Sequence, residues 1–257
     1  MICESLARRF RPAGFEQPEG FRKNYVKPRA ELQYTFDRWV NGLPENWYKI
    51  NTGEEYNKAC ELVKPIGEIP YREASSLLAG SKSESLAQRR AGLFVSACYN
   101  QSPEQIIAFD TDAPEINLIG YRLGENRVLV NNGKVGNWFA SRSSGVIVNN
   151  GESGVWFCYN SSGIVLNNGE SGDLFGYNSS GILIALQEPK SYGHKEKGRI
   201  IKPADCDRIP ELKKYLEELS ETARNIKDEM SARKFIEKYG ASGERIGPEI
   251  NRLLSIH

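Results

Sequence analysis

The chain has 257 residues, with 34 lysines and arginines against 33 aspartates and glutamates, so its formal net charge is only +1. Apolar residues make up 39% and charged residues 26%, as in an ordinary soluble globular protein. This balance excludes a chain that is basic or acidic as a whole, so any surface that binds a polyanion must be local. No long apolar run and no apolar signal-peptide core are present, so we expect neither membrane binding nor a secretion signal.

The cysteines and histidines limit the expected chemistry. The 5 cysteines are an odd number, widely spread and without a C-x-x-C pair, which favours reduced thiols in a cytoplasm over a disulfide framework or a zinc site. Only 2 histidines are present. Neither a G-x-S-x-G elbow nor a P-loop occurs. We therefore expect no metal, no cofactor and no catalytic residues.

Residues 1–29 are expected to form a basic extended arm, because they contain few apolar residues and several prolines. Aromatic residues are interleaved with the cations of the arm, which are Arg8, Arg9, Arg11, Arg22, Lys23, Lys27 and Arg29. Two interpretations are open. The arm packs on its own domain through the rings, or it binds RNA with cations on phosphates and rings on bases.

Residues 30–91 form the expected N-terminal helical region. Apolar residues recur there at three- and four-residue spacing, as on one face of a helix. Thr52 is a candidate N-cap. The predicted helices are 30–43, 54–63, 73–78 and 83–90. None of them carries a catalytic motif.

An 18-residue unit is written three times from Val128 onward and begins a fourth time at Ile182. The copies read VLVNNGKVGNWFASRSSG, VIVNNGESGVWFCYNSSG and IVLNNGESGDLFGYNSSG. Apolar triplets separated by Gly-containing turns at so short a period are typical of a β-solenoid. An upstream echo of the repeat at Cys98-Tyr99-Asn100 extends the predicted solenoid to residues 92–188, with about five coils. The predicted fold class is α+β: a central parallel β-solenoid flanked by N-terminal and C-terminal helical segments.

Turn chemistry accounts for the glycines and asparagines of the repeat. Asn-Gly favours positive φ, so we expect tight corners between the strands. Asparagines stacked at these corners are expected to bond to one another from coil to coil. The structural glycines are Gly133, Gly136, Gly151, Gly154, Gly169, Gly172 and Gly176.

The apolar triplets predict that both faces of the solenoid sheet are covered. Neighbouring side chains of a strand point to opposite faces, yet all three positions are apolar in every copy. We expect the flanking helices to provide the cover, with a homodimer or another protein partner as the alternative. The candidate interface residues are Trp138, Trp156, Leu212, Tyr215, Leu216, Leu219 and Ile226.

After the repeat, residues 189–204 are expected to form a basic loop and residues 205–257 a C-terminal helical region. In that region Asp207 is a candidate N-cap, and an apolar stripe runs as far as Met230. The candidate RNA- or phosphate-binding cations of the loop are Lys190, Lys195, Lys197, Arg199 and Lys202.

The repeat resembles the G-x-x-G-x-x-x-G pattern of a right-handed β-helix family. Gly169, Gly172 and Gly176 match the pattern in full, whereas Ala140 and Cys158 stand at its third position in the other copies. The family includes the C-terminal domain of the large chain of glutamate synthase and one of the component chains of formylmethanofuran dehydrogenase. The resemblance covers residues 92–188 and implies a structural spacer that contacts other chains and has no catalytic residues of its own.

Three functions remain open. The leading hypothesis is a cytoplasmic, non-enzymatic scaffold or assembly protein that makes protein–protein contacts through the solenoid and its helical flanks. The second is an RNA- or ribosome-associated factor that binds through the basic arm and the 190–202 loop. The third is an enzyme, for which the Asp-Thr-Asp turn at Asp110 and Asp112 offers carboxylates.

Overall fold

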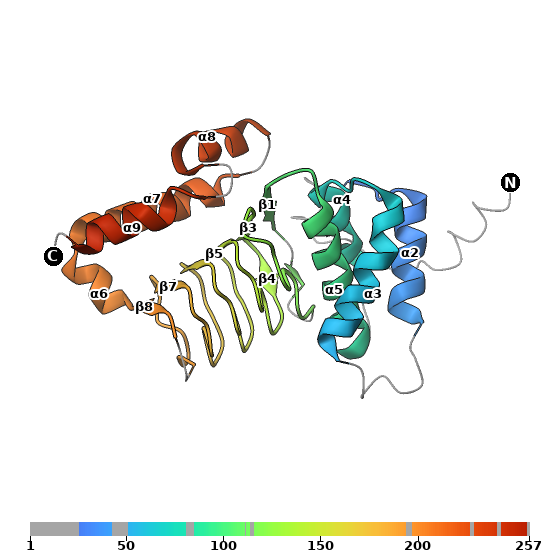
Figure 1. Ribbon diagram of the computed structural model, residues 1–257, viewed down its shortest axis with the longest axis horizontal. Helices are drawn as coiled ribbons and strands as arrows, with labels where there is room; N and C mark the ends of the chain where they lie inside the picture. Colours follow the sequence, from blue (N-terminus) through green and yellow to red (C-terminus); the bar gives the residue numbers. More distant parts are fainter. Residues whose placement is uncertain are drawn as a thin grey trace, which may run out of the picture.

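The computed structural model describes residues 26–42, 51–80, 85–110, 112–113, 116–193, 197–226, 229–240 and 243–255. A bundle of N-terminal helices lies at one end, the coiled strands follow it along the long axis, and the C-terminal helices lie across one face of the strands (Figure 1). This arrangement confirms the predicted parallel β-solenoid with helical flanks.

The N-terminal helices pack around the last of them, α5. They are α2 (Ala30–Asn41), α3 (Thr52–Val63), η3 (Lys64–Ile66), α4 (Tyr71–Ser76), η4 (Leu77–Gly80) and α5 (Ser85–Gln101). The cap of α3 is Asn51 and not Thr52, because the Asn51 side chain accepts a hydrogen bond from the Gly53 N–H at 2.7 Å.

Helix α5 corrects the predicted start of the solenoid. The echo of the repeat at Cys98 lies on this helix, and the first strand, β1 (Ile106–Phe109), begins only after it. All residues from 91 to 99 are buried, because α5 packs between the other helices and the first coil. A helix that is buried on all sides loses its amphipathic periodicity, so this segment did not show a helical pattern in the sequence.

Parallel strands form a 6-stranded main sheet in the order β1, β3 (Val128–Asn131), β5 (Val146–Asn149), β6 (Ile164–Asn167), β7 (Ile182–Ala185) and β8 (Arg199–Ile201). Equivalent residues of successive coils pair, so that Val128, Val146 and Ile164 form one column. A 2-stranded sheet joins β2 (Asp112–Ala113) to β4 (Lys134–Val135) on a second side of the coils.

The last coil extends the solenoid beyond the predicted end at residue 188. β8 pairs with β7, and the N–H groups of Gly193 and Lys197 donate to carbonyls of the preceding coil. The described part of the expected basic loop therefore belongs to a further coil as far as Ile201, and its last two residues begin α6. The sequence did not reveal this coil because its strand begins with Arg199 and lacks the Asn-Gly corner of the repeat.

The glycines at the Asn-Gly corners are required by close stacking and not by positive φ, which corrects the expected turn chemistry. A Cβ at Gly151 would lie 1.9 Å from the Gly133 carbonyl oxygen, and the φ of Gly151 is not positive. Positive φ occurs instead on the third side of the coils at alternate residues, which are Trp156, Cys158 and Asn160 in one copy. The crowding of backbone against backbone therefore explains the glycines of these corners, whereas Gly176, on the third side, has a φ of +70°.

The interior of the coils holds one aliphatic column and one aromatic column. Ile147 and its equivalents face Phe157 and its equivalents, whose rings contact one another along the axis. At the corner, Asn131 Nδ2 donates to Asn149 Oδ1 at 2.7 Å, and Asn149 Nδ2 donates to Asn167 Oδ1 at 2.8 Å. This ladder confirms the predicted asparagine stacking and satisfies amides that are fully buried.

Helices of the same chain cover the outer face of the main sheet. After β8 come α6 (Pro203–Arg208), α7 (Pro210–Arg224), α8 (Glu229–Tyr239) and α9 (Ile246–Ser255), and Figure 1 shows α7 and α9 lying across the strands. Val128 and Val148 of the sheet belong to the same apolar core as Leu216 of α7 and Ile250 of α9. Both faces of the sheet are therefore covered, as the apolar triplets predict.

Two details of the C-terminal region differ from the prediction. Ile209 occupies the N-cap position of α7 without a side-chain hydrogen bond, and Asp207 instead pairs with Lys213 at 2.7 Å. The apolar stripe stops at Ile226, and Met230 is 65% exposed. The reason is that α7 ends before Met230, which lies on the separate helix α8.

Candidate functional site

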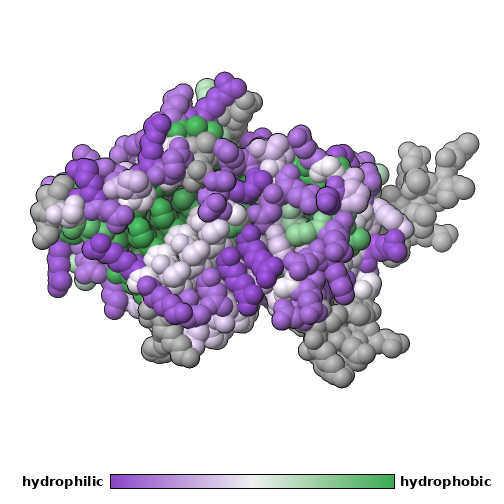
Figure 2. Space-filling view, in the orientation of Figure 1, coloured by the Kyte–Doolittle hydropathy of each residue, from purple (hydrophilic) through white to green (hydrophobic). Residues whose placement is uncertain are grey.

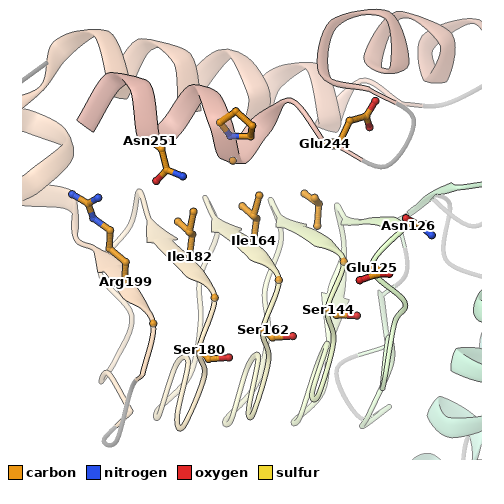
Figure 3. Close-up of a pocket in the computed structure, with 18 of the residues that line it drawn as sticks. Glu125, Asn126, Ser144, Ser162, Ile164, Ser180, Ile182, Arg199, Glu244 and Asn251 are labelled. Carbon is orange, nitrogen blue, oxygen red and sulfur yellow. The ribbon is translucent and has the colours of Figure 1, made fainter. Parts of the chain in front are cut away.

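A groove of about 940 Å³ runs along the solenoid between α9 and one row of coil corners. Figure 2 shows a hydrophobic stripe beneath the C-terminal helices with a paler row of residues beside it, and Figure 3 shows the residues that line the groove. Successive coils contribute equivalent residues to the lining. The groove therefore follows the solenoid axis.

One wall of the groove is made of Ser-Gly corners. Ser144, Ser162 and Ser180 are exposed and lie in one column (Figure 3). A Cβ at Gly163 would lie 1.9 Å from the carbonyl oxygen of Gly145, so the backbones of neighbouring coils are in direct contact here. The glycines therefore keep this wall level and free of large side chains.

The floor of the groove is the edge of the outer apolar column. Val146 is 5% exposed, whereas Ile164 and Ile182 of the later coils are only partly buried. α9 approaches the column with a small residue, because a Cβ at Gly247 would lie 3.1 Å from Ile164 Cδ1. The helix stands close to the strands and still leaves part of the isoleucine column open to the groove.

The two ends of the groove carry opposite charge. Arg199 lies with Asn251 at the end formed by the last coil (Figure 3), and Lys197 belongs to the same coil. Glu125 and Glu244 lie at the other end (Figure 3). A charged chain that occupied the groove would be oriented by this polarity.

A second surface lies on the third side of the coils, where alternate residues have positive φ. The rings of Trp138 and Trp156 stack with centroids 5.0 Å apart and planes 3° apart, and those of Tyr159 and Tyr177 stack at 5.8 Å and 12°. All four rings are half-buried. In each Trp-Phe pair the tryptophan faces outward, whereas the phenylalanine is buried inside the coils.

Where this aromatic surface meets the N-terminal helices, a cavity of about 240 Å³ is formed. Trp138 and Tyr159 line it from the solenoid, and Thr52 and Arg89 line it from the helices. Arg89 Nη2 lies 3.1 Å from a carboxylate oxygen of Glu55 and donates to Thr52 Oγ1 at 2.7 Å. The cavity thus combines aromatic rings with a guanidinium group that is held in place.

The described members of the predicted cation set fall into two groups at opposite ends of the molecule. Lys27 and Arg29 lie beside α2 at the helical end, where Arg29 pairs with Glu73 at 3.0 Å. Exposed cations lie around the last coil, at the opposite end of the molecule (Figure 1): Lys190, Lys197, Arg199 and Lys202. The remaining predicted cations lie outside the described residues: Arg8, Arg9, Arg11, Arg22, Lys23 and Lys195.

The predicted interface residues are used mostly within the chain. Those buried in the apolar core between α7 and the sheet are Leu212, Leu216, Leu219 and Ile226. Tyr215 is half-buried beside this core, and Trp138 and Trp156 stack on each other. A homodimer stays a prediction, and the outer face of the sheet no longer gives a reason for it.

The described cysteines are free thiols: Cys60, Cys98, Cys158 and Cys206. Burial raises the pKa of each thiol, to about 11 for Cys206, so the reactive thiolate form is disfavoured. Among the described residues, no group of three or more His, Cys, Asp or Glu side chains is placed to hold a metal ion. Asp110 is exposed after β1 and is not among the residues that line the groove or the cavity, and Asp112 opens β2.

Neither the groove nor the cavity is among the sites predicted from the sequence. The Ser-Ser-Gly that ends each copy was the available signal for the groove wall, but the opposite wall, α9, lies outside the repeat. The cavity had a fainter signal, because Ser141 stands where the later copies have a tyrosine.

Within the described ranges, no helix is both long and apolar enough to cross a lipid bilayer. In comparisons with known proteins, no protein-family model matches the chain, and no curated protein and no solved structure matches it significantly.

Proposed function

We propose that this protein is a non-enzymatic scaffold that holds an extended segment of a partner protein in the groove beneath α9. The observation that carries the proposal is the isoleucine column: Ile164 and Ile182 are partly exposed on the groove floor, in a face that helices otherwise cover. A partner that covers these side chains removes apolar surface from water. The resemblance of the repeat to a β-helix family of spacers is in keeping with this role.

The length of the groove suits an extended peptide. Parallel strands lie about 4.8 Å apart, so the corners that line the groove from the first coil to the last span roughly 19 Å. An extended chain advances about 3.3 Å per residue, so a segment of about six residues covers this distance.

The walls of the groove predict the pattern of that segment. An extended chain presents its side chains alternately to two sides. One set would lie against Ile164, Ile182 and Gly247, which favours apolar side chains there. The other set would lie near Ser162 and solvent, which favours polar side chains.

The charges at the ends give the segment a direction. Lys197 and Arg199 favour an acidic residue at the end formed by the last coil. Glu125 and Glu244 favour a basic residue at the other end. The expected ligand is therefore a short segment with alternating apolar side chains and opposite charges at its two ends.

Selection from a random peptide display library on the purified full chain tests this function. We expect enriched peptides to share the apolar alternation and the opposite terminal charges, and to bind the protein with micromolar dissociation constants in a fluorescence polarisation assay. If no peptide family is enriched over an unrelated immobilised protein, the proposed function is wrong.

Two variants locate the binding site. Ser162→Arg places a long side chain on an exposed wall of the groove and should weaken peptide binding by about tenfold or more without loss of stability. Glu170→Arg introduces the same side chain at an exposed position outside the groove and is the matched control. Equal binding to wild type and Ser162→Arg would exclude the groove as the binding site.

A second proposal, RNA binding, is supported by the exposed cations around the last coil. Lys202 Nζ lies 4.8 Å from the centroid of the Tyr192 ring, so a cation and an aromatic ring are adjacent there. Filter binding of RNA should then weaken steeply as salt rises, and deletion of residues 1–29 should weaken it further. RNA binding that is absent at low salt would remove this alternative.

A further inference from the structure

The tyrosines on the third side of the coils form a column from which one ring is missing. Tyr121, Tyr159 and Tyr177 hold equivalent positions in their coils, and Ser141 holds that position in the coil between Tyr121 and Tyr159. The backbone register supports this equivalence. The residue that follows Tyr121, Ser141 or Tyr159 donates its backbone N–H to the carbonyl of the column residue in the next coil. The Arg142 N–H, for example, donates to the Tyr159 carbonyl at 2.7 Å.

Each outward tyrosine ring of the column nests against the tryptophan column. The Tyr159 centroid lies 5.5 Å from Trp156 in its own coil and 5.1 Å from Trp138 in the preceding coil. By the same offset, a ring at position 141 would lie between Trp138 and Leu118. Serine has no ring to fill this place.

The cavity of about 240 Å³ occupies this place, since Leu118, Tyr121, Trp138, Ser141 and Tyr159 line it together. Engineered apolar cavities of about 150 Å³ bind benzene, whereas drug-sized ligands occupy about 300–1,000 Å³. The volume therefore suits a single substituted ring. Two coil spacings, roughly 10 Å, separate the positions of Tyr121 and Tyr159, so a ring midway lies at an ordinary aromatic pair distance from each.

Two buried polar atoms at this cavity lack a hydrogen-bond partner. Tyr121 is 2% exposed, and its hydroxyl has no partner within the described part of the chain. The buried Nε of Arg89 also has none among the described residues. Both residues line the cavity. An unpaired buried donor is costly, so a ligand that brings acceptor atoms within reach of these groups would remove that cost.

The charges around the cavity favour an anion. Glu55 balances part of the charge of Arg89 and holds its guanidinium in place, while Arg142, which is exposed, adds a second guanidinium to the lining. Guanidinium groups bind carboxylates through paired N–H donors. We propose that this cavity binds a small aromatic carboxylate, with its ring between Tyr121 and Tyr159 and its carboxylate on the two arginines.

Titration calorimetry on the full chain with benzoate and 4-hydroxybenzoate tests the proposal. Cyclohexanecarboxylate has the charge without the planar ring, benzamide has the ring without the charge, and each should bind about tenfold more weakly or worse. A nucleoside monophosphate, which is larger and carries phosphate in place of carboxylate, should not compete. Equal affinity for benzoate and cyclohexanecarboxylate, tighter binding of the nucleotide, or no heat with either aromatic carboxylate overturns the proposal.

Ser141→Tyr is the decisive variant, because it supplies the ring that the later coils carry and so fills the cavity with a side chain suited to the fold. We expect it to abolish benzoate binding while keeping the thermal unfolding midpoint at or above that of the wild type. Tyr121→Phe keeps the ring, removes the unpaired hydroxyl and should weaken binding about threefold to tenfold. Wild-type affinity in Ser141→Tyr overturns the assignment.

Two control variants test whether benzoate binding depends on this cavity alone. One changes the tyrosine column outside the cavity, and the other changes the groove. Tyr177→Ser makes the reverse change at a position that does not line the cavity, so benzoate affinity should stay unchanged. Ser162→Arg alters the groove and should also leave benzoate binding unchanged, so a failure of the groove proposal is distinguishable from a failure of this one. Loss of benzoate binding in both controls would contradict the assigned site.

Discussion

The solenoid has two outward apolar surfaces, and helices cover only one of them. On the main sheet, the columns that contain Val128 and Val148 are buried beneath α7 and α9 and form a second core with them. On the third side, Trp138 stacks on Trp156 and Tyr159 stacks on Tyr177, and all four rings remain half-exposed.

Side-chain shape explains this difference. A column of aliphatic side chains leaves its outer surface in water unless another layer covers it. Aromatic rings at the coil spacing instead bury their faces against one another, because that spacing is close to the separation of aromatic pairs. The covered surface therefore depends on helices far along the chain, whereas the stacked surface depends on neighbouring coils alone.

Both surfaces rest on the tight stacking of the coil corners, so the largest effect is expected there. Gly163→Val places side-chain atoms against backbone 1.9 Å from the added Cβ, and it should destabilise the protein by more than about 4 kcal/mol in urea unfolding. Gly67→Ala is the control: its φ is +80° but no atom lies within 4 Å of a new Cβ, so about 1 kcal/mol is expected. Similar losses in the two variants would refute the stacking explanation.

The stability of the protein should depend on the buried side chains through which α7 covers the main sheet. Leu216→Ala removes a fully buried side chain between α7 and the sheet and should cost about 3 kcal/mol in urea unfolding. Leu254→Ala, at a partly buried position of α9, serves as the comparison and should cost less. If Leu216→Ala unfolds at the wild-type urea concentration, α7 is not required to cover the sheet.

On the stacked surface, the loss of a tryptophan side chain should reduce stability less than the loss of the smaller Leu216 side chain does beneath α7. Trp156 stacks on Trp138 and contacts two tyrosine rings but is half-exposed, so Trp156→Ala should cost about 2 kcal/mol. Near-ultraviolet circular dichroism should also lose the signal of the stacked pair. A loss greater than that of Leu216→Ala would reverse the proposed contrast between the surfaces.

Charge pairs on the covering helices should contribute least to the free energy of unfolding. A hydrogen bond from Lys238 Nζ lowers the pKa of the Glu218 carboxyl, so this pair stabilises the fold above the unfolded-state pKa near 4.5 and loses its effect as pH falls through the lower folded-state value. Because both side chains are largely exposed, Glu218→Gln should cost less than about 1 kcal/mol at neutral pH. A larger cost at pH 7, or one that persists at pH 2, would contradict this assignment.

The sequence by itself determined the internal structure of the repeated coil. The apolar triplets, the asparagine ladder at Asn149 and the requirement for a cover on both faces follow from chemistry that is repeated in every copy, and repetition makes it visible. The corner glycines were recognised for the wrong reason, since close stacking and not positive φ requires them.

Tertiary structure alone decided how the unique segments join the coils. α5 stands where a first coil was expected, and the sequence did not reveal it because a helix buried on all sides shows no amphipathic periodicity. The last coil was unrecognised because Arg199 opens its strand. The groove needs α9 beside the Ser-Gly corners, and the cavity needs Arg89 beside the gap at Ser141. Such contacts join segments far apart in the chain, and their registers depend on side-chain packing that no local pattern records.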